Sequence, residues 1–305
     1  MKLTHFRDLL AVVQTGSLRA ASRQLGIAQP VITRSIRELE HELGTPLLER
    51  NTKGVALTQV GERFVRRIEA VRAEIRRARE EVDQWSGDYV GEVAIGVTPM
   101  VSMTLLPSAV AEFNRRHPKA VTKITQSLFR PIENRLADGL LDLWIGTVDE
   151  NTVSQRFSVE TLLPHNRRIA ARRDHPLLGA KNLAELAGAS WVRPSLDDRS
   201  VETDVEEAFQ RLGIPPPNVA VHSSSMLVTL QIVANTDLLT MLPEEIFLLM
   251  PVEQFCVPLE LIPPLPAAPI CMVHRQGLPM TPLAENLSDL MRKAAHNYVR
   301  GKPGE

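Results

Sequence analysis

Five residues near the N-terminus have the chemistry and the spacing of base recognition in DNA. They lie within the stretch GIAQPVITRSIRELEHELG, residues 26–44, and are Gln29, Pro30, Thr33, Arg34 and Arg37. In the major groove a glutamine can pair with an adenine edge and an arginine with a guanine edge. The alternative is that these residues form the solvated face of a helix, so the surrounding elements must decide.

The stretch is predicted to form a helix with one apolar and one polar face. Its apolar stripe recurs at helical spacing and consists of Ile32, Ile36, Leu39 and Leu43. The opposite face carries Pro30, Arg34, Arg37 and His41, with Thr33 beside them. Proline favours the first turn because it has no N–H to leave unpaired there and its φ is already helical. Gly44 is a natural C-terminal stop.

Two shorter helices and a hairpin are predicted around this helix. Apolar residues at helical spacing indicate the first helix: Leu3, Phe6, Leu9, Leu10 and Val13. Gly16 ends it, and Ser17 can cap the second helix, which runs to Gly26. Residues 47–49 and 55–58 are β-prone and predict a wing, with Arg50 and Lys53 at its tip placed for phosphates. This order of elements is typical of a helix-turn-helix protein and favours DNA binding.

Residues 59–85 are predicted to form one long helix with a heptad seam. The seam alternates steps of four and three residues and consists of Phe64, Ile68, Val71, Ile75, Ala78, Val82 and Trp85. A seam this narrow favours a partner helix, and a dimer would present two recognition helices to a two-fold symmetric site. The alternative is an amphipathic helix that packs on its own domain.

From Gly91 onward the pattern changes to alternating strands and helices, as in parallel α/β architecture. A second such unit begins after Leu163, and the apolar run PICMVHR with the final helix LAENLSDLMRKAAHNYV returns to the first. Two such lobes with a cleft between them form a ligand clamp.

The strand ends and following helix starts of this body predict an anion-binding effector site. The residues expected there are Thr98, Pro99, Met100, Ser102, Ser127, Phe129, Thr147, Ser195, Ser225 and Met226. Hydroxyls with apolar walls suit a small carboxylate or sulfonate, with an aromatic body as one option. For each serine the alternative is simple helix capping.

Composition and charge agree with this organisation. The 305 residues are 44% apolar and 23% charged, which predicts two domains, and no run of eighteen apolar residues exists. The net charge of -1 divides into +3 up to Thr58 and -4 beyond it, so the head is mildly basic. The amphipathic N-terminus and the lack of CxxC spacing lead us to expect a cytoplasmic protein with no membrane partner.

No catalytic or metal site is expected. The chain has no nucleophile elbow, phosphate loop or metal-ligand cluster, and HSSSM at 222–226 lacks the context of a catalytic serine. Asp197 and Asp198 fit a polar loop better than a carboxylate pair. Cys256 and Cys271 do not suggest zinc or a disulfide, and redox sensing is the weaker alternative to inert packing. We therefore expect no enzyme, no metal and no cofactor other than a small-molecule effector.

Together these motifs resemble the LysR-type transcriptional regulators over essentially the full chain. The resemblance rests on the head, residues 16–64, and on the segments EVAIGVTP, LLP, FNRRHP, LADGLLDLWIG and LLTMLPEEI. It implies an α+β multi-domain fold: a winged helix-turn-helix at 1–58, a dimerising linker helix at 59–88, and a two-lobed α/β effector domain at 91–305 of the periplasmic-binding-protein-like type. Lobe I is expected at 91–162 and 268–305, and lobe II at 163–267.

The resemblance also implies a function and partners. It describes a cytoplasmic regulator that binds a dyad-symmetric promoter as a dimer of dimers, responds to a small effector, and has RNA polymerase as a further partner. By position, Gln29, Pro30, Thr33 and Arg34 match the base-reading turn. The alternatives are a small-molecule-binding protein or an enzyme on the same α/β clamp. Ala28 departs from the serine that commonly precedes the Gln-Pro pair, and losing that cap costs about 1 kcal/mol.

Overall fold

The computed structural model describes residues 1–51, 54–87, 89–193, 203–249, 252–260 and 262–301. The chain forms two compact units, Met1–Arg77 and Ala78–Glu305. The division falls inside the long helix α4 (Gln59–Trp85) and not at the expected boundary after residue 58. In the described ranges, no helix is both long and apolar enough to span a membrane.

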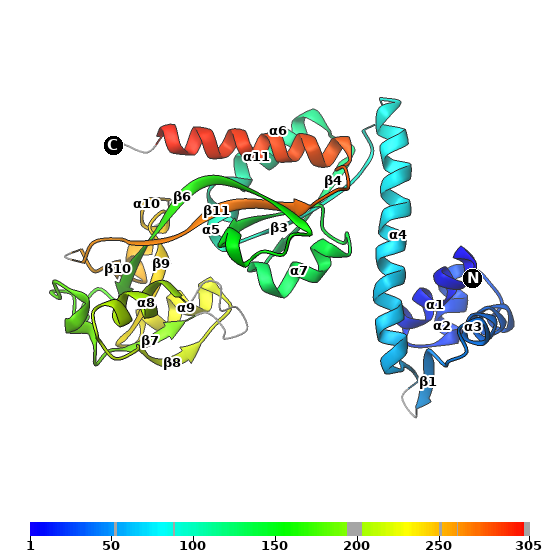
Figure 1. Ribbon diagram of the computed structural model, residues 1–305, viewed down its shortest axis with the longest axis horizontal. Coiled ribbons are helices and arrows are strands. Elements are labelled where there is room, and N and C mark those ends of the chain that lie inside the picture. The colour runs from blue at the N-terminus through cyan, green and yellow to red at the C-terminus, as the bar shows by residue number, and fades with distance from the viewer. Residues whose placement is uncertain (52–53, 88, 194–202, 250–251, 261, 302–305) are drawn as a thin grey trace. The chain divides into compact units, whose positions relative to one another are not determined.

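The first unit is a three-helix bundle with a two-stranded wing (Figure 1). Its helices are α1 (Leu3–Thr15), α2 (Leu18–Leu25) and α3 (Gln29–Leu43), and its strands are β1 (Leu48–Asn51) and β2 (Gly54–Leu57). Each helix ends at a glycine with φ between 65° and 70°, a conformation that only glycine adopts without strain. Ser17 caps α2 as predicted, because its Oγ accepts a hydrogen bond from Ala20 N at 3.1 Å.

The core of this unit includes two of the seven residues of the predicted dimer seam. The stripe of α3 faces inward as expected, with Ile32 and Leu39 fully buried. Phe64 and Ile68 of α4, which we assigned to a partner helix, pack instead against Leu9 and other core residues of their own unit. Assigning Phe64 and Ile68 to a dimer contact was therefore wrong, because both pack in the core of the first unit.

Strands of the second unit's first lobe are parallel and covered by helices on both faces. The strands are β3 (Gly91–Val97), β4 (Ala120–Gln126) and β5 (Leu143–Thr147), and both neighbours pair with β3 in parallel. The helices are α5 (Pro99–Met103), α6 (Leu106–Arg116), α7 (Phe129–Ala137) and α11 (Pro282–Gly301). Val93 and Ile95 pack toward α6 and α11, whereas Ala94 and Trp144 pack toward α7, as the alternation of side chains along a strand requires.

The second lobe repeats this arrangement. Its strands β7 (Ser190–Arg193), β8 (Asn218–His222) and β9 (Leu238–Pro243) are parallel, and its helices are α8 (Thr203–Arg211), α9 (Met226–Ala234) and α10 (Ile246–Leu249). Short elements complete the chain: the 3-10 turns η1 (Glu150–Thr152), η2 (Leu183–Leu186) and η4 (Val252–Gln254), and strand β10 (Val257–Pro258). The segment NLAELAG forms only the single turn η2.

Two long antiparallel strands join the lobes. β6 (Phe157–Ala171) and β11 (Leu265–Arg275) pair along most of their length, and β5 and β9 add to them on either side. Figure 1 shows both strands crossing from β3 to β9. The second unit is therefore not purely parallel. The lobe boundary expected at 162/163 falls inside β6.

Candidate DNA-binding face and effector cavity

The first turn of α3 exposes the predicted base-reading residues. Gln29 and Pro30 are the first two residues of the helix and are exposed, as are Arg34 and Arg37. Thr33 is half-buried, and its Oγ1 donates to the Gln29 carbonyl at 3.0 Å. These residues therefore lie on the face of α3 that points away from the core of the unit, as the spacing of its apolar residues predicted.

The entry into α3 is held by α2 and not by a cap. Ala28 occupies the N-cap position and offers no side-chain acceptor, so Val31 N donates only to the Ala28 carbonyl, at 2.9 Å. Ser22 closes the turn instead: its Oγ donates to the Ile27 carbonyl at 2.6 Å, and its own carbonyl accepts from Ile27 N at 3.2 Å. The turn between the two helices is therefore fixed even without the usual serine.

Arg34 and Arg37 differ in how they are held. Arg34 Nε donates to Glu38 Oε1 at 2.8 Å, although its side chain is 83% exposed. This hydrogen bond holds the pKa of Glu38 below its ordinary value. Within the described part of the chain, Arg37 has no such partner.

A carboxylate from α3 anchors the wing. Glu40 Oε1 accepts hydrogen bonds from Leu47 N at 2.8 Å and Leu48 N at 3.1 Å, where β1 begins. At the other end of the hairpin, Val55 N donates to the Gly16 carbonyl at 3.2 Å. Arg50 lies in β1 opposite Val55, but its side chain and the whole of Lys53 fall outside the described residues.

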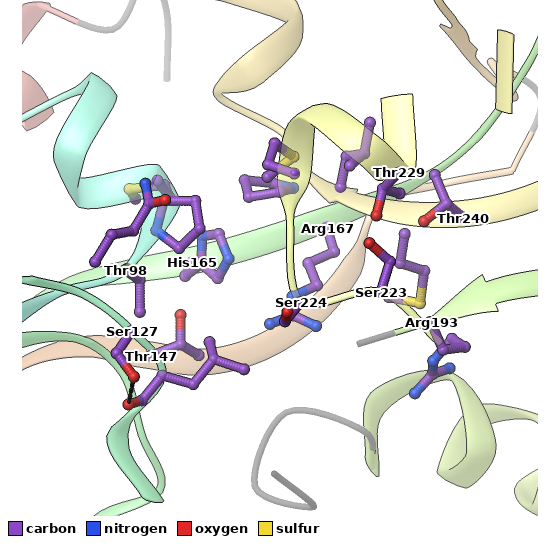
Figure 2. A pocket seen from close by; sticks show the side chains of 18 residues that line it. Thr98, Ser127, Thr147, His165, Arg167, Arg193, Ser223, Ser224, Thr229 and Thr240 are labelled. Carbon is purple, nitrogen blue, oxygen red and sulfur yellow. Dashed lines mark hydrogen bonds between the residues drawn. The ribbon is translucent and has the colours of Figure 1, made fainter. Parts of the chain in front are cut away.

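A cavity of about 150 Å³ lies between the lobes of the second unit (Figure 2). Residues of both lobes and of β6 line it. They are Thr98, Pro99, Met100, Gln126, Ser127, Leu128, Thr147, His165, Arg167, Arg193, Ser223, Ser224, Met226, Thr229, Thr240, Met241, Leu242 and Pro243.

Six of the ten residues predicted for the effector site line this cavity: Thr98, Pro99, Met100, Ser127, Thr147 and Met226. Three do not. Ser102 lies behind it and accepts a hydrogen bond from Gln126 Nε2 at 3.1 Å, Phe129 is buried against Trp144, and Ser225 caps α9 through Val228 N. Ser195 falls outside the described residues.

The cationic side chains of the cavity were not predicted from the sequence. His165 and Arg167 lie two residues apart on β6, and therefore on the same face of that strand, while Arg193 is the last residue of β7. Arg193 also precedes the expected strand-end position at Ser195 by two residues. A search for charged residues that end an apolar strand would have found Arg193. His165 and Arg167 could be predicted only if the full length of β6 had been recognised.

The lining of the cavity favours an anion. Among the described lining residues there are two arginines and one histidine but no Asp or Glu. Figure 2 shows Thr98, Ser127 and Thr147 on one side and Ser223, Thr229 and Thr240 on the other, so hydroxyls of both lobes face the same space. Thr98 Oγ1 is buried without a hydrogen-bond partner among the described residues and is thus an available donor.

Behind the lining, His165 meets a second buried group. Its Nδ1 lies 3.4 Å from Glu245 Oε2, and the two side chains are 1% and 2% exposed. This contact is not a hydrogen bond, but it places a buried carboxylate next to the imidazole that lines the cavity.

The two cysteines are packed away from this cavity. Both are fully buried, and burial raises the pKa of the Cys256 thiol to about 11. Burial also raises the pKa of Cys271. Raised thiol pKa values oppose the thiolate that redox sensing requires.

Comparisons with known proteins match both units. The model of the bacterial regulatory helix-turn-helix protein, lysR family, matches residues 3–62, and the model of the LysR substrate binding domain matches residues 86–296. The HTH-type transcriptional regulator TdcA of Escherichia coli K12 is 26% identical over 261 residues, 83% of each chain. The SDS degradation transcriptional activation protein of a Pseudomonas species is 26% identical over 291 residues, 95% of each chain.

Solved structures of this family share the fold. The LysR family transcriptional regulator CbnR has a TM-score of 0.70 at 19% identity and is matched over 97% of this chain and 99% of that one. Full-length CbnR in complex with its target DNA gives the same TM-score at 20% identity, over 96% of this chain and 100% of that one. With a helix-turn-helix in its first unit and the substrate-binding domain spanning most of its length, the chain belongs to the LysR family of transcriptional regulators and is not an enzyme.

Proposed function

We propose that this regulator reads a dyad-symmetric promoter site with the first turns of α3 and is controlled by a small organic anion bound between its lobes. The effector part rests on one observation above all: among the described residues that line the cavity there are two arginines and a histidine but no carboxylate. The DNA part rests on the exposed polar face of α3.

On DNA, the residues of α3 divide into two groups by position. Gln29, Thr33 and Arg34 stand at the end of the helix that would enter the major groove, where base edges are read, with Pro30 beside them. Arg37 lies one turn further along the helix and has no side-chain partner in the described residues, which suits a phosphate. Arg50 and Lys53 of the wing are proposed as further phosphate contacts.

The size of the cavity limits the effector. An engineered apolar cavity of about 150 Å³ holds a benzene molecule, so a ligand with a body of that size would fill the space here. Met100, Leu128 and Met226 supply apolar walls, and the arginines would bind one charged group. We therefore propose a small carboxylate or sulfonate, including aromatic acids such as benzoate.

The effector would act by favouring one arrangement of the two lobes. Its contacts would include Thr98 and Ser127 of the first lobe and Ser223 and Thr229 of the second, which are joined by β6 and β11. A ligand that touches both lobes binds one lobe angle better than another and so shifts the population toward it. In a dimer, that shift would change how the paired heads sit on DNA.

For assembly, we propose a dimer through α4 and a dimer of dimers beyond it. Val71, Val82 and Trp85 on the predicted seam are 43%, 65% and 79% exposed, in contrast to Phe64 and Ile68. An apolar hollow in the first unit lies along Val71 and Ile75 of the same helix. A second copy would cover these side chains. Promoter binding also leads us to propose a cytoplasmic location and contact with RNA polymerase.

Thermal unfolding of the full chain tests the effector proposal. Benzoate and its neutral analogue benzamide form a matched pair of probes, and only benzoate should raise the Tm of the second unit. At a ligand concentration of 100 Kd the stabilisation is about 2.7 kcal/mol. Equal shifts with both compounds, or none with any small carboxylate or sulfonate, would contradict an anion site.

Two variants on β6 sharpen this test. Arg167→Gln should abolish the shift, because it removes a cavity cation. Arg168→Gln is the matched control, since the neighbouring side chain lies on the other face of β6 and pairs with Glu260 at 2.9 Å. The control should keep the shift in full.

A further inference from the structure

A glutamate that is not itself proposed to contact a base lies beside the guanidinium of Arg34. Glu38 is four residues further along α3, and its Oε1 accepts a hydrogen bond from Arg34 Nε at 2.8 Å. Within the part of the chain that the structure describes, Arg34 makes no other hydrogen bond. Its two terminal nitrogens, which carry four N–H donors, therefore have no hydrogen-bond partner among the described residues.

The pair is poorly suited to stabilising the helix. An acidic residue placed before a basic one at i,i+4 is the favourable order, and here the order is reversed. Exposed ion pairs of this kind contribute little to stability in any case. Glu42, one turn further along α3, pairs with the N-terminal amine at 2.5 Å. A role for the Arg34–Glu38 pair in helix stability is therefore weak.

The other carboxylate oxygen lies near a buried histidine of α1, beyond hydrogen-bond distance. His5 of α1 is 97% buried, and its Nε2 lies 3.7 Å from Glu38 Oε2. One oxygen of Glu38 thus faces the core of the unit and the other faces Arg34. An arginine held in this way loses less rotamer freedom when it binds a base than an arginine free in solvent.

We infer that Glu38 is a positioning residue for base recognition: it fixes the Arg34 guanidinium so that the two terminal nitrogens meet O6 and N7 of one guanine. This inference rests on the proposed function, in which Arg34 faces the base edges. Guanine presents two acceptors side by side in the major groove, and an arginine whose Nε is already bonded offers a matching pair of donors. Arg37 has no such support and is suited to a phosphate, whose recognition tolerates several orientations.

The test measures the affinity of the full-length protein for two DNA sites. One is its selected site, and the other is the same site with A·T in place of the G·C pair that Arg34 reads in each half-site. Arg34→Ala identifies that pair, because it should lower the preference for G·C over A·T there by about tenfold. This is within the range of one bidentate contact. Glu38→Ala should reduce the guanine preference at the same pair by about threefold, and at no other pair, as loss of one exposed charge-assisted contact predicts.

Two further variants separate positioning from charge. Glu38→Gln keeps a hydrogen-bond acceptor for Arg34 Nε and should keep most of the guanine preference, although both changes at Glu38 remove a negative charge near DNA and raise affinity for every sequence. Glu42→Ala makes the same change of charge one turn away and should raise affinity without altering the preference.

The possible results separate positioning by Glu38 from base recognition by Arg34. Full guanine preference in Glu38→Ala, with only a uniform gain in affinity, would overturn the positioning role while leaving base recognition by Arg34 intact. An Arg34→Ala variant that selects the same sequence as the wild type would overturn both. Loss of preference for cytosine at a neighbouring pair in Glu38→Ala would show that the glutamate itself reads a base, and would overturn the inference as well.

Discussion

Replacing Ala28 with serine should stabilise α3 by restoring the missing cap. Serine accepts a hydrogen bond from the backbone N–H at the second or third helical position. In α3 the second position is Pro30, which has no N–H, so only Val31 N is available. The same geometry is already present in α2, where Ser17 Oγ accepts from the third residue, Ala20, at 3.1 Å.

The size of the stabilisation by Ala28→Ser depends on the hydrogen-bond partner that Val31 N already has. A cap is typically worth about 1 kcal/mol, within a range of about 0.5–2 kcal/mol. Because Val31 N donates to the Ala28 carbonyl at 2.9 Å, the new hydroxyl shares a satisfied donor, and we expect the low end, about 0.5 kcal/mol. For a unit the size of Met1–Arg77 this corresponds to a rise in Tm of about 2–4 °C. Ser17→Ala should lower the free energy of unfolding by about 1 kcal/mol.

Urea unfolding of the full chain, followed by amide hydrogen exchange in α3, measures both changes. Ala28→Val is the matched control, since valine offers no acceptor and ranks with alanine at this position. If Ala28→Ser leaves exchange at Val31 and Ile32 unchanged while Ser17→Ala shows its full loss, the N-cap argument for α3 is refuted. On DNA the added hydroxyl should raise affinity for all sequences alike, because a phosphate contact carries no base preference.

Three further changes test other parts of the structure. In Gly61→Ala the added Cβ would lie 2.1 Å from the Leu47 carbonyl oxygen, so the free energy of unfolding of the first unit should fall by about 1–3 kcal/mol. Gly179→Ala, which has open space around the added Cβ, should be neutral in the same urea titration. Glu40→Ala should cost about 2 kcal/mol and weaken binding to all DNA sequences, because the wing loses a charged acceptor for two backbone N–H groups; binding as tight as that of the wild type would contradict this role. With its pKa near 11, Cys256 should resist iodoacetamide at pH 8 in the folded protein and react only after unfolding, and alkylation of the native chain at the rate of a free thiol would show that the burial is wrong.

The head could be predicted almost completely from the sequence, because its signals are local. The apolar stripe of α3 predicted both the helix and its exposed face. Ile32 and Leu39 are fully buried, as that stripe requires. Gly16 and Ser17 marked the break between the first two helices. The heptad seam was only partly informative, since periodicity shows that α4 has an apolar face but not which residues cover it.

The cavity could be predicted only in part, because it depends on pairing between distant strands. β6 contains Pro164 and several polar residues and does not read as a buried run, so its crossing of both lobes was not recognised. The position of Arg167 follows from its register opposite Pro243 of β9, 76 residues later in the chain. Thr98 and Ser127 were found because strand ends in α/β domains gather at one edge, a rule that applies within each lobe.

Selection of bound sites from random duplex DNA would show directly whether α3 reads base sequence. The purified full-length protein and the double variant Gln29→Ala with Arg34→Ala would be compared at low and moderate salt. We predict an enriched inverted repeat for the wild type, and a much larger loss of specific than of non-specific binding for the variant. An absence of enrichment at both salt concentrations, or an equal fall of both kinds of binding in the variant, would contradict base recognition by this helix.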